Sequence, residues 1–236
     1  MTIGKDFELT WLGHAAFHLK TPGGKHVLFD PWIDNPKCPD RWKSFERVDM
    51  LLLTHGHADH AGSAPDLVRK HQPEIPGMFE ICLWLENEGA KNIRPMNKGG
   101  SQTVAGLEVQ MVHADHSSGI NGSKGVLVGG EACGFVVTLE NGFRIYHAGD
   151  TNVFGDMRLI GELYAPDVAC LPIGGLFTMG PREAAKAIEL LGPRWVVPMH
   201  YGTFPPLTGT PDELRRHLTA GTKTEIVALE PGQTLK

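Results

Sequence analysis

The sequence predicts an α/β fold in which two mixed β-sheets lie face to face between helices, a four-layer αββα sandwich. Strand-like segments crowd the first third of the chain, hairpin-like pairs fill the middle, and strands alternate with helices in the last third. Each sheet of such a chain needs a helical layer over its outer face. No linker or internal repeat divides the 236 residues, so we expect one domain over residues 1–236.

The first third is organised by apolar runs that end at turn residues. Four strands are expected, over Phe7–Leu12, Ala15–Lys20, Lys25–Asp30 and Val48–Leu53. The segment Asp34–Arg47 mixes proline with both signs of charge, which indicates a surface excursion. The apolar run Val48–Leu53 ends abruptly at Thr54, as a buried strand does when it enters a functional loop. A helix is expected from Asp59 to about His71.

Turn residues and periodicity define the remaining elements. A hairpin around Gly106 is expected within Thr103–Val112, and Ser117–Gly130 is expected to be a Gly/Ser loop with few apolar residues. The turn Asn141-Gly142 joins the expected strands Gly134–Glu140 and Phe143–Ala148. The last third then alternates between strands and helices, which are expected at Asp167–Ile173, Pro181–Leu191, Arg194–Met199, Pro211–Ala220 and Glu225–Leu229.

Composition limits the class of partner. The chain is 41% hydrophobic with a net charge of −5, and a protein that grips many phosphates needs a basic face, which argues against nucleic acid. No apolar stretch is long enough to span a membrane. Acidic residues near the N-terminus do not fit a signal peptide, so a cytoplasmic location is expected.

The four cysteines form no CxxC pair, and no disulfide framework is expected. Cys82, Cys133 and Cys170 lie in apolar or Gly-rich runs, which predicts buried thiols. Cys38 lies in the Pro-rich excursion, where we expect an exposed thiol.

The segment 54–60 reads Thr-His-Gly-His-Ala-Asp-His and follows an apolar strand. Imidazole nitrogens and carboxylate oxygens are ligands that zinc, manganese and iron accept. Gly56 allows a sharp turn, so that His55 and His57 can converge on one ion, while Asp59 and His60 can face a second. A solvated His-rich loop is the alternative, but the density of ligands after a strand favours a two-metal site.

This motif resembles the metal signature of the metallo-β-lactamase superfamily. Further segments are similar to a group of small metal-dependent hydrolases, themselves similar to the ascorbate-6-phosphate lactonases. They are Leu12–Phe17, Asp30–Trp32, Leu171–Gly175, Thr178–Pro181 and His200–Pro205. The resemblance covers nearly the whole chain and implies the metallo-β-lactamase fold.

The resemblance implies a ligand set of seven residues. One metal would be held by His55, His57 and His116, and the other by Asp59, His60 and His200, with Asp150 bridging the two. His113 competes with His116. The alternation of Val109, Met111 and His113 suggests that His113 belongs to a strand, while His116 opens a polar loop, which favours His116.

Other residues are candidates for supporting roles. His14 would bind substrate or relay a proton, with a turn histidine bonded to backbone as an equal alternative. Asp30 would support a ligand imidazole rather than only form a turn. Tyr201, Thr178 and Met179 are candidates to line the substrate pocket, and the tyrosine hydroxyl could donate to an oxyanion, although loop packing explains them equally well.

We therefore predict a binuclear metal-dependent hydrolase in which a hydroxide that bridges the metals attacks a lactone or carboxylic ester, with a phosphate on the substrate as an option. Asp59 would shuttle the proton. Zinc is the first candidate, with manganese or iron as alternatives. A phosphodiesterase or ribonuclease-type hydrolase and a non-catalytic metal-binding module stay open, and so does a homo-oligomer. The expected binding partner is a small-molecule substrate.

Overall fold

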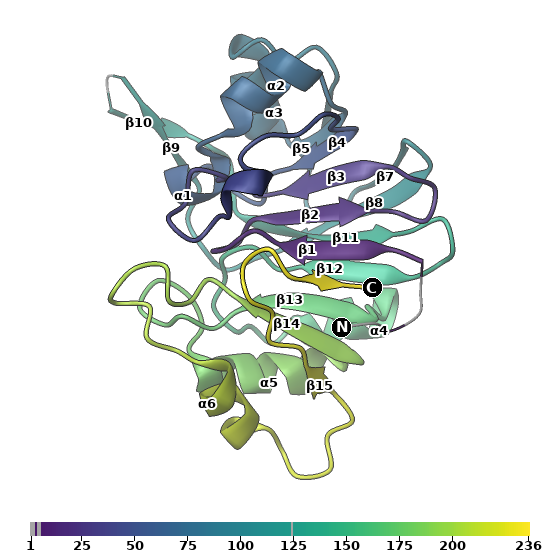
Figure 1. The fold of residues 1–236 in the computed structure, drawn as a ribbon, viewed down its shortest axis with the longest axis vertical. Helices are drawn as coiled ribbons and strands as arrows, with labels where there is room; N and C mark the ends of the chain where they lie inside the picture. Colours follow the sequence, from purple (N-terminus) through teal and green to yellow (C-terminus); the bar gives the residue numbers. More distant parts are fainter. Residues whose placement is uncertain (1–2, 4–5, 124) are drawn as a thin grey trace.

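The computed structural model describes residue 3, residues 6–123 and residues 125–236. Two large sheets form its centre (Figure 1). The five-stranded sheet has the order β16-β1-β2-β3-β4, with bounds Thr234–Leu235, Glu8–Trp11, Phe17–Lys20, His26–Phe29 and Met50–Leu52. The seven-stranded sheet has the order β15-β14-β13-β12-β11-β8-β7, with bounds Glu225–Ile226, Trp195–Met199, Val168–Pro172, Arg144–His147, Cys133–Thr138, Leu107–His113 and Ser101–Val104.

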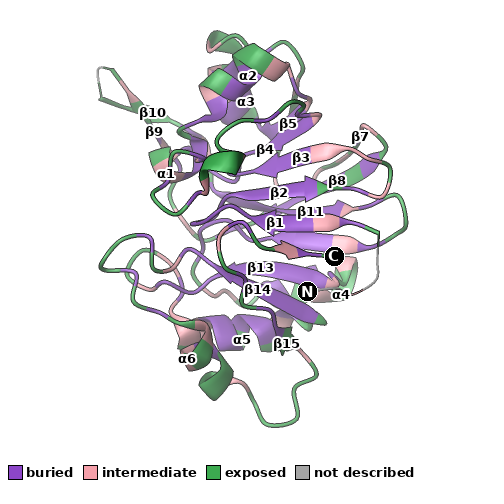
Figure 2. Ribbon diagram, in the orientation of Figure 1, coloured by how far each residue is buried: buried purple, intermediate pink, exposed green. Residues whose placement is uncertain are grey.

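The two sheets pack through side chains that alternate along each strand. On β2 and β3, Phe17 pairs with Phe29 and Leu19 with Val27, so these four lie on one face of the five-stranded sheet. They belong to one buried cluster with residues of the facing sheet, such as Phe135. The ring of Phe29 stacks on His147 at 5.1 Å between centroids, which joins the two sheets directly. The main core is therefore the layer between the sheets, and Figure 2 shows the strands of both sheets coloured mostly as buried.

Helices cover the outer faces, as the αββα prediction requires. Helices α2 (Ala64–His71) and α3 (Phe79–Asn87) place Leu67, Val68 and Ile81 in the same cluster as the five-stranded sheet. Helices α4 (Met157–Tyr164), α5 (Pro181–Leu191) and α6 (Pro211–His217) cover the seven-stranded sheet in a second cluster. Figure 1 shows α2 and α3 at one end of the molecule and α5 and α6 at the other. No helix in the described residues combines the length and apolarity needed to cross a membrane.

Several elements differ from the sequence-based expectations. The helix expected from Asp59 to His71 is two helices, α1 (Ala58–Ala61) and α2, separated by Gly62-Ser63. The excursion contains a short 3-10 helix, Asp40–Trp42, and a parallel pair, β5 (Ile75–Met78) and β6 (Ile93–Met96), flanks α3. Short elements such as these carry little periodic signal.

Two further expectations were wrong. Cys38 is buried, because the excursion folds back onto the five-stranded sheet and covers it. The expected loop Ser117–Gly130 contains an antiparallel hairpin, β9 (Gly119–Gly122) and β10 (Gly125–Val128), which projects from the body (Figure 1). Glycine is depleted in strands generally, so the frequent glycines here predicted a loop and hid the strand-forming run Val126–Val128.

A histidine pair lies on the outer face of the five-stranded sheet, away from the inter-sheet core. His18 Nε2 is 2.9 Å from His26 Nδ1, and the His18 ring packs on Trp42 and Phe45 of the excursion. His18 Nδ1 is buried without a hydrogen-bond partner in the described residues. Burial therefore lowers the pKa of His18 to about 4.

This lowered pKa predicts acid sensitivity. Between about pH 4 and 6.5 the unfolded chain binds more protons at His18 than the folded one, so its contribution to the unfolding free energy falls as the pH drops below 6.5. At pH 5 the loss would be at most ~2 kcal/mol. His18→Gln should flatten the pH dependence in urea titrations at pH 5, 6 and 7, whereas His217→Gln, at an exposed position, should not. Equal slopes in both variants would contradict the assignment.

Candidate metal centre

The predicted ligands meet where strands of the two sheets end. In the five-stranded sheet, His14, Asp30 and His55 follow the carboxyl ends of β1, β3 and β4. In the seven-stranded sheet, His116, Asp150 and His200 follow β8, β12 and β14. The pairing directions make these strands mutually parallel within each sheet, so all six residues lie at one edge of the sandwich. At this edge polar side chains can lie close together without being buried in the apolar core between the sheets.

One group of donor atoms is formed by His55, His57 and His116, whose ligand atoms all lie within 4.8 Å of one another. His55 Nε2 is 3.0 Å from His57 Nδ1, and the His116 ring is 5.1 Å from each of the other two rings. The short turn at Gly56 brings the first two together. A Cβ at Gly56 would lie 2.4 Å from Ile120, so this position also requires glycine.

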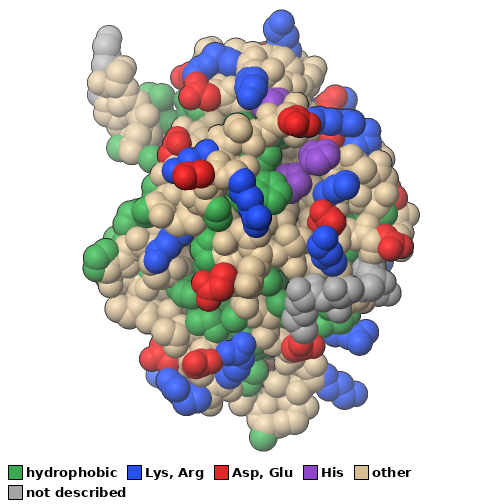
Figure 3. All heavy atoms as spheres, viewed as in Figure 1, with side chains coloured by type: hydrophobic (Ala, Val, Ile, Leu, Met, Phe, Trp, Pro, Cys, Tyr) green, Lys and Arg blue, Asp and Glu red, His purple; other side chains and the backbone are tan. Residues whose placement is uncertain are grey.

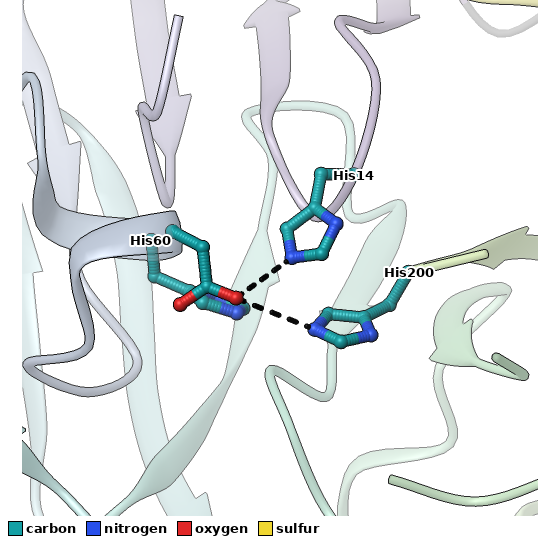
Figure 4. Close-up of side chains that lie close together, drawn as sticks. His14, His60 and His200 are labelled. Carbon is teal, nitrogen blue, oxygen red and sulfur yellow. Dashed lines mark hydrogen bonds and ion pairs between the residues drawn. The ribbon is translucent and has the colours of Figure 1, made fainter. Parts of the chain in front are cut away.

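A second group is formed by His14, Asp59, His60 and His200, again within 4.8 Å. Asp59 Oδ2 lies 3.1 Å from His14 Nε2 and 3.9 Å from His200 Nε2. Figure 4 shows the rings of His14, His60 and His200 converging from three separate segments. The Asp59 side chain is 32% exposed, whereas His14 and His60 are fully buried. Asp59 therefore faces the open side of this group.

Asp150 lies between the two groups. Its Oδ2 is 3.0 Å from His200 Nε2 and 3.3 Å from His60 Nε2 in one group. The same oxygen is 3.6 Å from His116 Nε2 and 3.9 Å from His55 Nε2 in the other. One carboxylate thus has imidazole nitrogens from both groups within 4 Å.

Asp30 determines which nitrogens of the nearby histidines carry protons. Its carboxylate accepts hydrogen bonds from Thr54 N, Thr54 Oγ1 and His60 Nδ1 at 2.8, 2.7 and 2.9 Å. The Thr54 hydroxyl proton is thereby used, so Thr54 Oγ1 accepts from His55 Nδ1 at 3.0 Å. Both His55 and His60 then direct Nε2 into the site, where these atoms can bind a metal.

The electrostatics of the cluster fit a cation. Burial opposes charge on His60, but Asp150 and Asp30 outweigh it and raise its pKa well above the usual range. Burial likewise opposes charge on Asp150, yet His200 and His60 hold its pKa well below normal. Within the described residues, His60 Nε2, His200 Nε2 and Asp150 Oδ1 are buried without a hydrogen bond. A divalent ion would satisfy such atoms and supply the positive charge that the carboxylates favour.

His14 and Asp59 form a chain of hydrogen bonds that ends at Thr203. Burial lowers the pKa of His14 to about 4, so its ring is neutral at pH 7. The Asp59 carboxylate can only accept, so His14 Nε2 donates to it and Nδ1 accepts from Thr203 Oγ1 at 3.0 Å. Thr203 was not among the residues predicted from the sequence, although it lies in the His200–Pro205 segment.

The backbone is strained at three of these positions. His14, Asp30 and His200 have φ values of 53°, 43° and 58°, in the left-handed region that disfavours residues other than glycine. A hydrogen bond of 2.9 Å from His200 N to His14 O joins the two loops and the two sheets. This hydrogen bond helps to hold the backbone of His14 and His200 in the strained conformation.

The remaining candidates lie elsewhere. His113 ends β8 on the exposed side, where its Nδ1 is 3.1 Å from Lys98 Nζ, while His116 turns toward the site. Tyr201 stacks on Trp11 at 5.3 Å and, within the described residues, forms no hydrogen bond or ion pair with the seven predicted ligands. Burial raises its pKa to about 12. Met179 is buried and Thr178 is half-buried in the loop after β13.

Known proteins resemble this chain over nearly its whole length. A family model described as a β-lactamase superfamily domain matches residues 8–200. A UPF0173 metal-dependent hydrolase of Solibacter usitatus is 50% identical over 230 residues, which cover 97% of this chain and 99% of the relative. Another from Koribacter versatilis is 48% identical over 228 residues and covers 96% and 97%. The structure of Igni18, a metallo hydrolase from Ignicoccus hospitalis, has 38% identity, a TM-score of 0.84 and 97% coverage of both chains.

The Asp30 network predicts a measurable effect on metal affinity. Asp30→Asn keeps the shape but replaces one acceptor oxygen by a donor, so a hydrogen bond to Thr54 or His60 is lost. Metal affinity should fall by about 10–100-fold, measured by competition with a chelator and elemental analysis. Asp34→Asn on the exposed side of the excursion is the matched control. Unchanged affinity in Asp30→Asn would show that the network does not orient the ligands.

Proposed function

This chain belongs to the metallo-β-lactamase superfamily and is a metal-dependent hydrolase, and we propose that it hydrolyses a lactone or other carboxylic ester of a small molecule with two divalent metal ions. The observation that carries the two-ion proposal is Asp150, whose Oδ2 has imidazole nitrogens of both donor groups within 4 Å. A single ion could not be reached by all seven predicted ligands.

The proposed roles follow the two donor groups. His55, His57 and His116 hold one ion, Asp59, His60 and His200 hold the other, and Asp150 is shared. When bound, the ions lower the pKa of an attacking water and polarise the substrate carbonyl. His14 is assigned to Asp59 rather than to a metal, because Asp59 and Thr203 occupy both of its ring nitrogens.

Asp59 is the proposed proton acceptor. The nearby histidine His14 holds its pKa below the usual range against the effect of burial, so the carboxylate is ionised at neutral pH. His14 donates to one lone pair of Oδ2, so the other lone pair of Oδ2 stays available to an ion and Oδ1 stays available to accept a proton. Asp150 is only 3% exposed and cannot exchange protons with solvent as readily.

The residues around the site support a neutral substrate over a phosphodiester. His14 contacts the rings of Trp32 and Phe204, which stack on each other at 5.7 Å beside the second donor group. In the described residues, the ion pairs of Asp59 and Asp150 are with histidines, and no lysine or arginine joins them. Phosphate recognition normally uses such cations. Zinc is proposed first, with manganese or iron as alternatives for this all-N/O donor set.

Asp150 provides the decisive test of the two-ion site. Wild-type protein, purified without added metal or a His-tag, should contain about two equivalents of metal by elemental analysis. Asp150→Ala should lose metal and lose hydrolysis of aryl esters and lactones by on the order of 10³-fold or more. Asp115→Ala, outside the ligand set but hydrogen-bonded to Asn152, is the control.

Each outcome separates the candidate functions. Two equivalents with ester turnover support the proposal, whereas turnover of bis-(p-nitrophenyl) phosphate but not of esters would favour the phosphodiesterase alternative. Metal-loaded protein that turns over neither substrate would favour a non-catalytic metal-binding module. One equivalent in wild type would contradict the binuclear site.

The hydrogen-bond chain to Thr203 predicts a separate kinetic effect. Thr203→Val removes the donor to His14 Nδ1, so the ring can rotate or change tautomer and no longer fixes Asp59. We expect kcat to fall by about 10–100-fold with little change in KM or metal content. Thr203→Ser keeps the hydroxyl and should restore kcat. Equal losses in both variants would indicate a packing role only.

A further inference from the structure

The β9–β10 hairpin leaves an apolar strand edge open to solvent. We call these two strands, Gly119–Gly122 and Gly125–Val128, the arm. In the described residues β10 pairs only with β9, so its outer edge presents free backbone N–H and C=O groups. Val126, Leu127 and Val128 are 75%, 50% and 81% exposed, and no residue of the two strands is charged. Figure 3 shows the arm projecting from the body, with hydrophobic and uncharged atoms along it.

The two faces of the arm differ. Leu127 pairs with the buried Ile120 and faces a groove of about 490 Å³ that is also lined by Pro65 and Trp84. Val126 and Val128 lie on the opposite face, because side chains alternate along a strand. Each valine there sits opposite a small or short side chain, Asn121 or Gly119, so this face offers its apolar surface without cover.

A free strand edge of this kind is normally protected by charge, proline or a bulge, or it pairs with another strand. The arm has none of these protections in its described residues. The sequence of the edge is also symmetric, since Val-Leu-Val reads the same in both directions about Leu127. An antiparallel partner of identical sequence therefore meets matching side chains.

We propose that the arm is a homodimer contact, in which β10 pairs antiparallel with β10 of a second copy of this chain about a two-fold axis. The axis stands perpendicular to the sheet, so paired residues must lie on the same face in both copies. With Leu127 opposite the second Leu127, each Val126 lies opposite a Val128. All three cross-strand pairs are then apolar, and the two hairpins form one four-stranded sheet.

The base of the arm is hydrogen-bonded to the segment around Gly56, which holds the outer edge of β10 toward solvent. Ser118 Oγ accepts from Gly56 N at 3.2 Å and donates to Gly129 O at 2.9 Å. Ile120 packs against Gly56, between His55 and His57. Because two short strands bury much less than the ~800 Å² that each partner contributes to a standard interface, we expect a dimer that dissociates at micromolar concentration.

A cysteine placed on the two-fold axis tests this geometry directly. Opposite residues of an antiparallel pair have Cα atoms about 4.5–5.5 Å apart, within the range that a disulfide spans. The four native cysteines are buried and give no background. Leu127→Cys should therefore form a disulfide-linked dimer with oxidised glutathione at about 50 μM. Leu163→Cys, 68% exposed on α4, is the matched control and should stay monomeric.

Sedimentation velocity tests the wild-type chain over about 1–200 μM. We expect a reversible monomer–dimer equilibrium that Val126→Lys/Val128→Lys abolishes, with unchanged circular dichroism and metal content. Monomeric wild type across this range, or equal crosslinking of Leu127→Cys and Leu163→Cys, would overturn the proposal. So would wild-type monomers that co-sediment with phosphatidylcholine vesicles through the two valines, which would assign the arm to a lipid surface.

Discussion

Asp30 is a fully buried carboxylate that accepts three hydrogen bonds at the point where β3 ends, and the geometry of the metal centre depends on it. Two of its donors belong to Thr54 at the end of β4, and the third is the His60 ring on α1. The same network sets the protonated nitrogen of His55 through the threonine hydroxyl. A residue outside the predicted ligand set thus connects two strand ends, one helix and two candidate ligands.

The convergence of the candidate ligands could be predicted from the sequence because the segments that carry them follow short apolar strands. Strands that run in the same direction within a sheet end at the same edge. Polar residues that follow these strands are therefore expected to lie near one another. His14 and Tyr201 also follow strand ends, but their contacts could not be predicted in this way. His14 Nε2 contacts Asp59, 45 positions away in the sequence. The β1–β2 turn also meets the loop after β14, where His14 Nδ1 contacts Thr203, 189 positions away. Tyr201 adjoins His200 in sequence, yet stacks on Trp11.

The hairpin of β9 and β10 was missed for a different reason. Its glycines and the polar residues around it predicted a loop, and a strand propensity confined to three residues did not outweigh them. The strands β5 and β6 were missed because each contains a proline, Pro76 or Pro95, which argues against a strand. The helices α3 and α4 were missed as well, and α4 carries Gly161 in its interior, which weakens the helical signal.

The ligands are divided between the two sheets. His55, His57, Asp59 and His60 come from one segment after β4, the last two on α1, whereas His116, Asp150 and His200 come from three loops of the seven-stranded sheet. During synthesis the first segment leaves the ribosome long before the second set exists. Each donor group draws residues from both sheets, so the first segment alone carries only part of each. The full donor sets and the apolar layer between the sheets are therefore completed by the same packing of one sheet on the other.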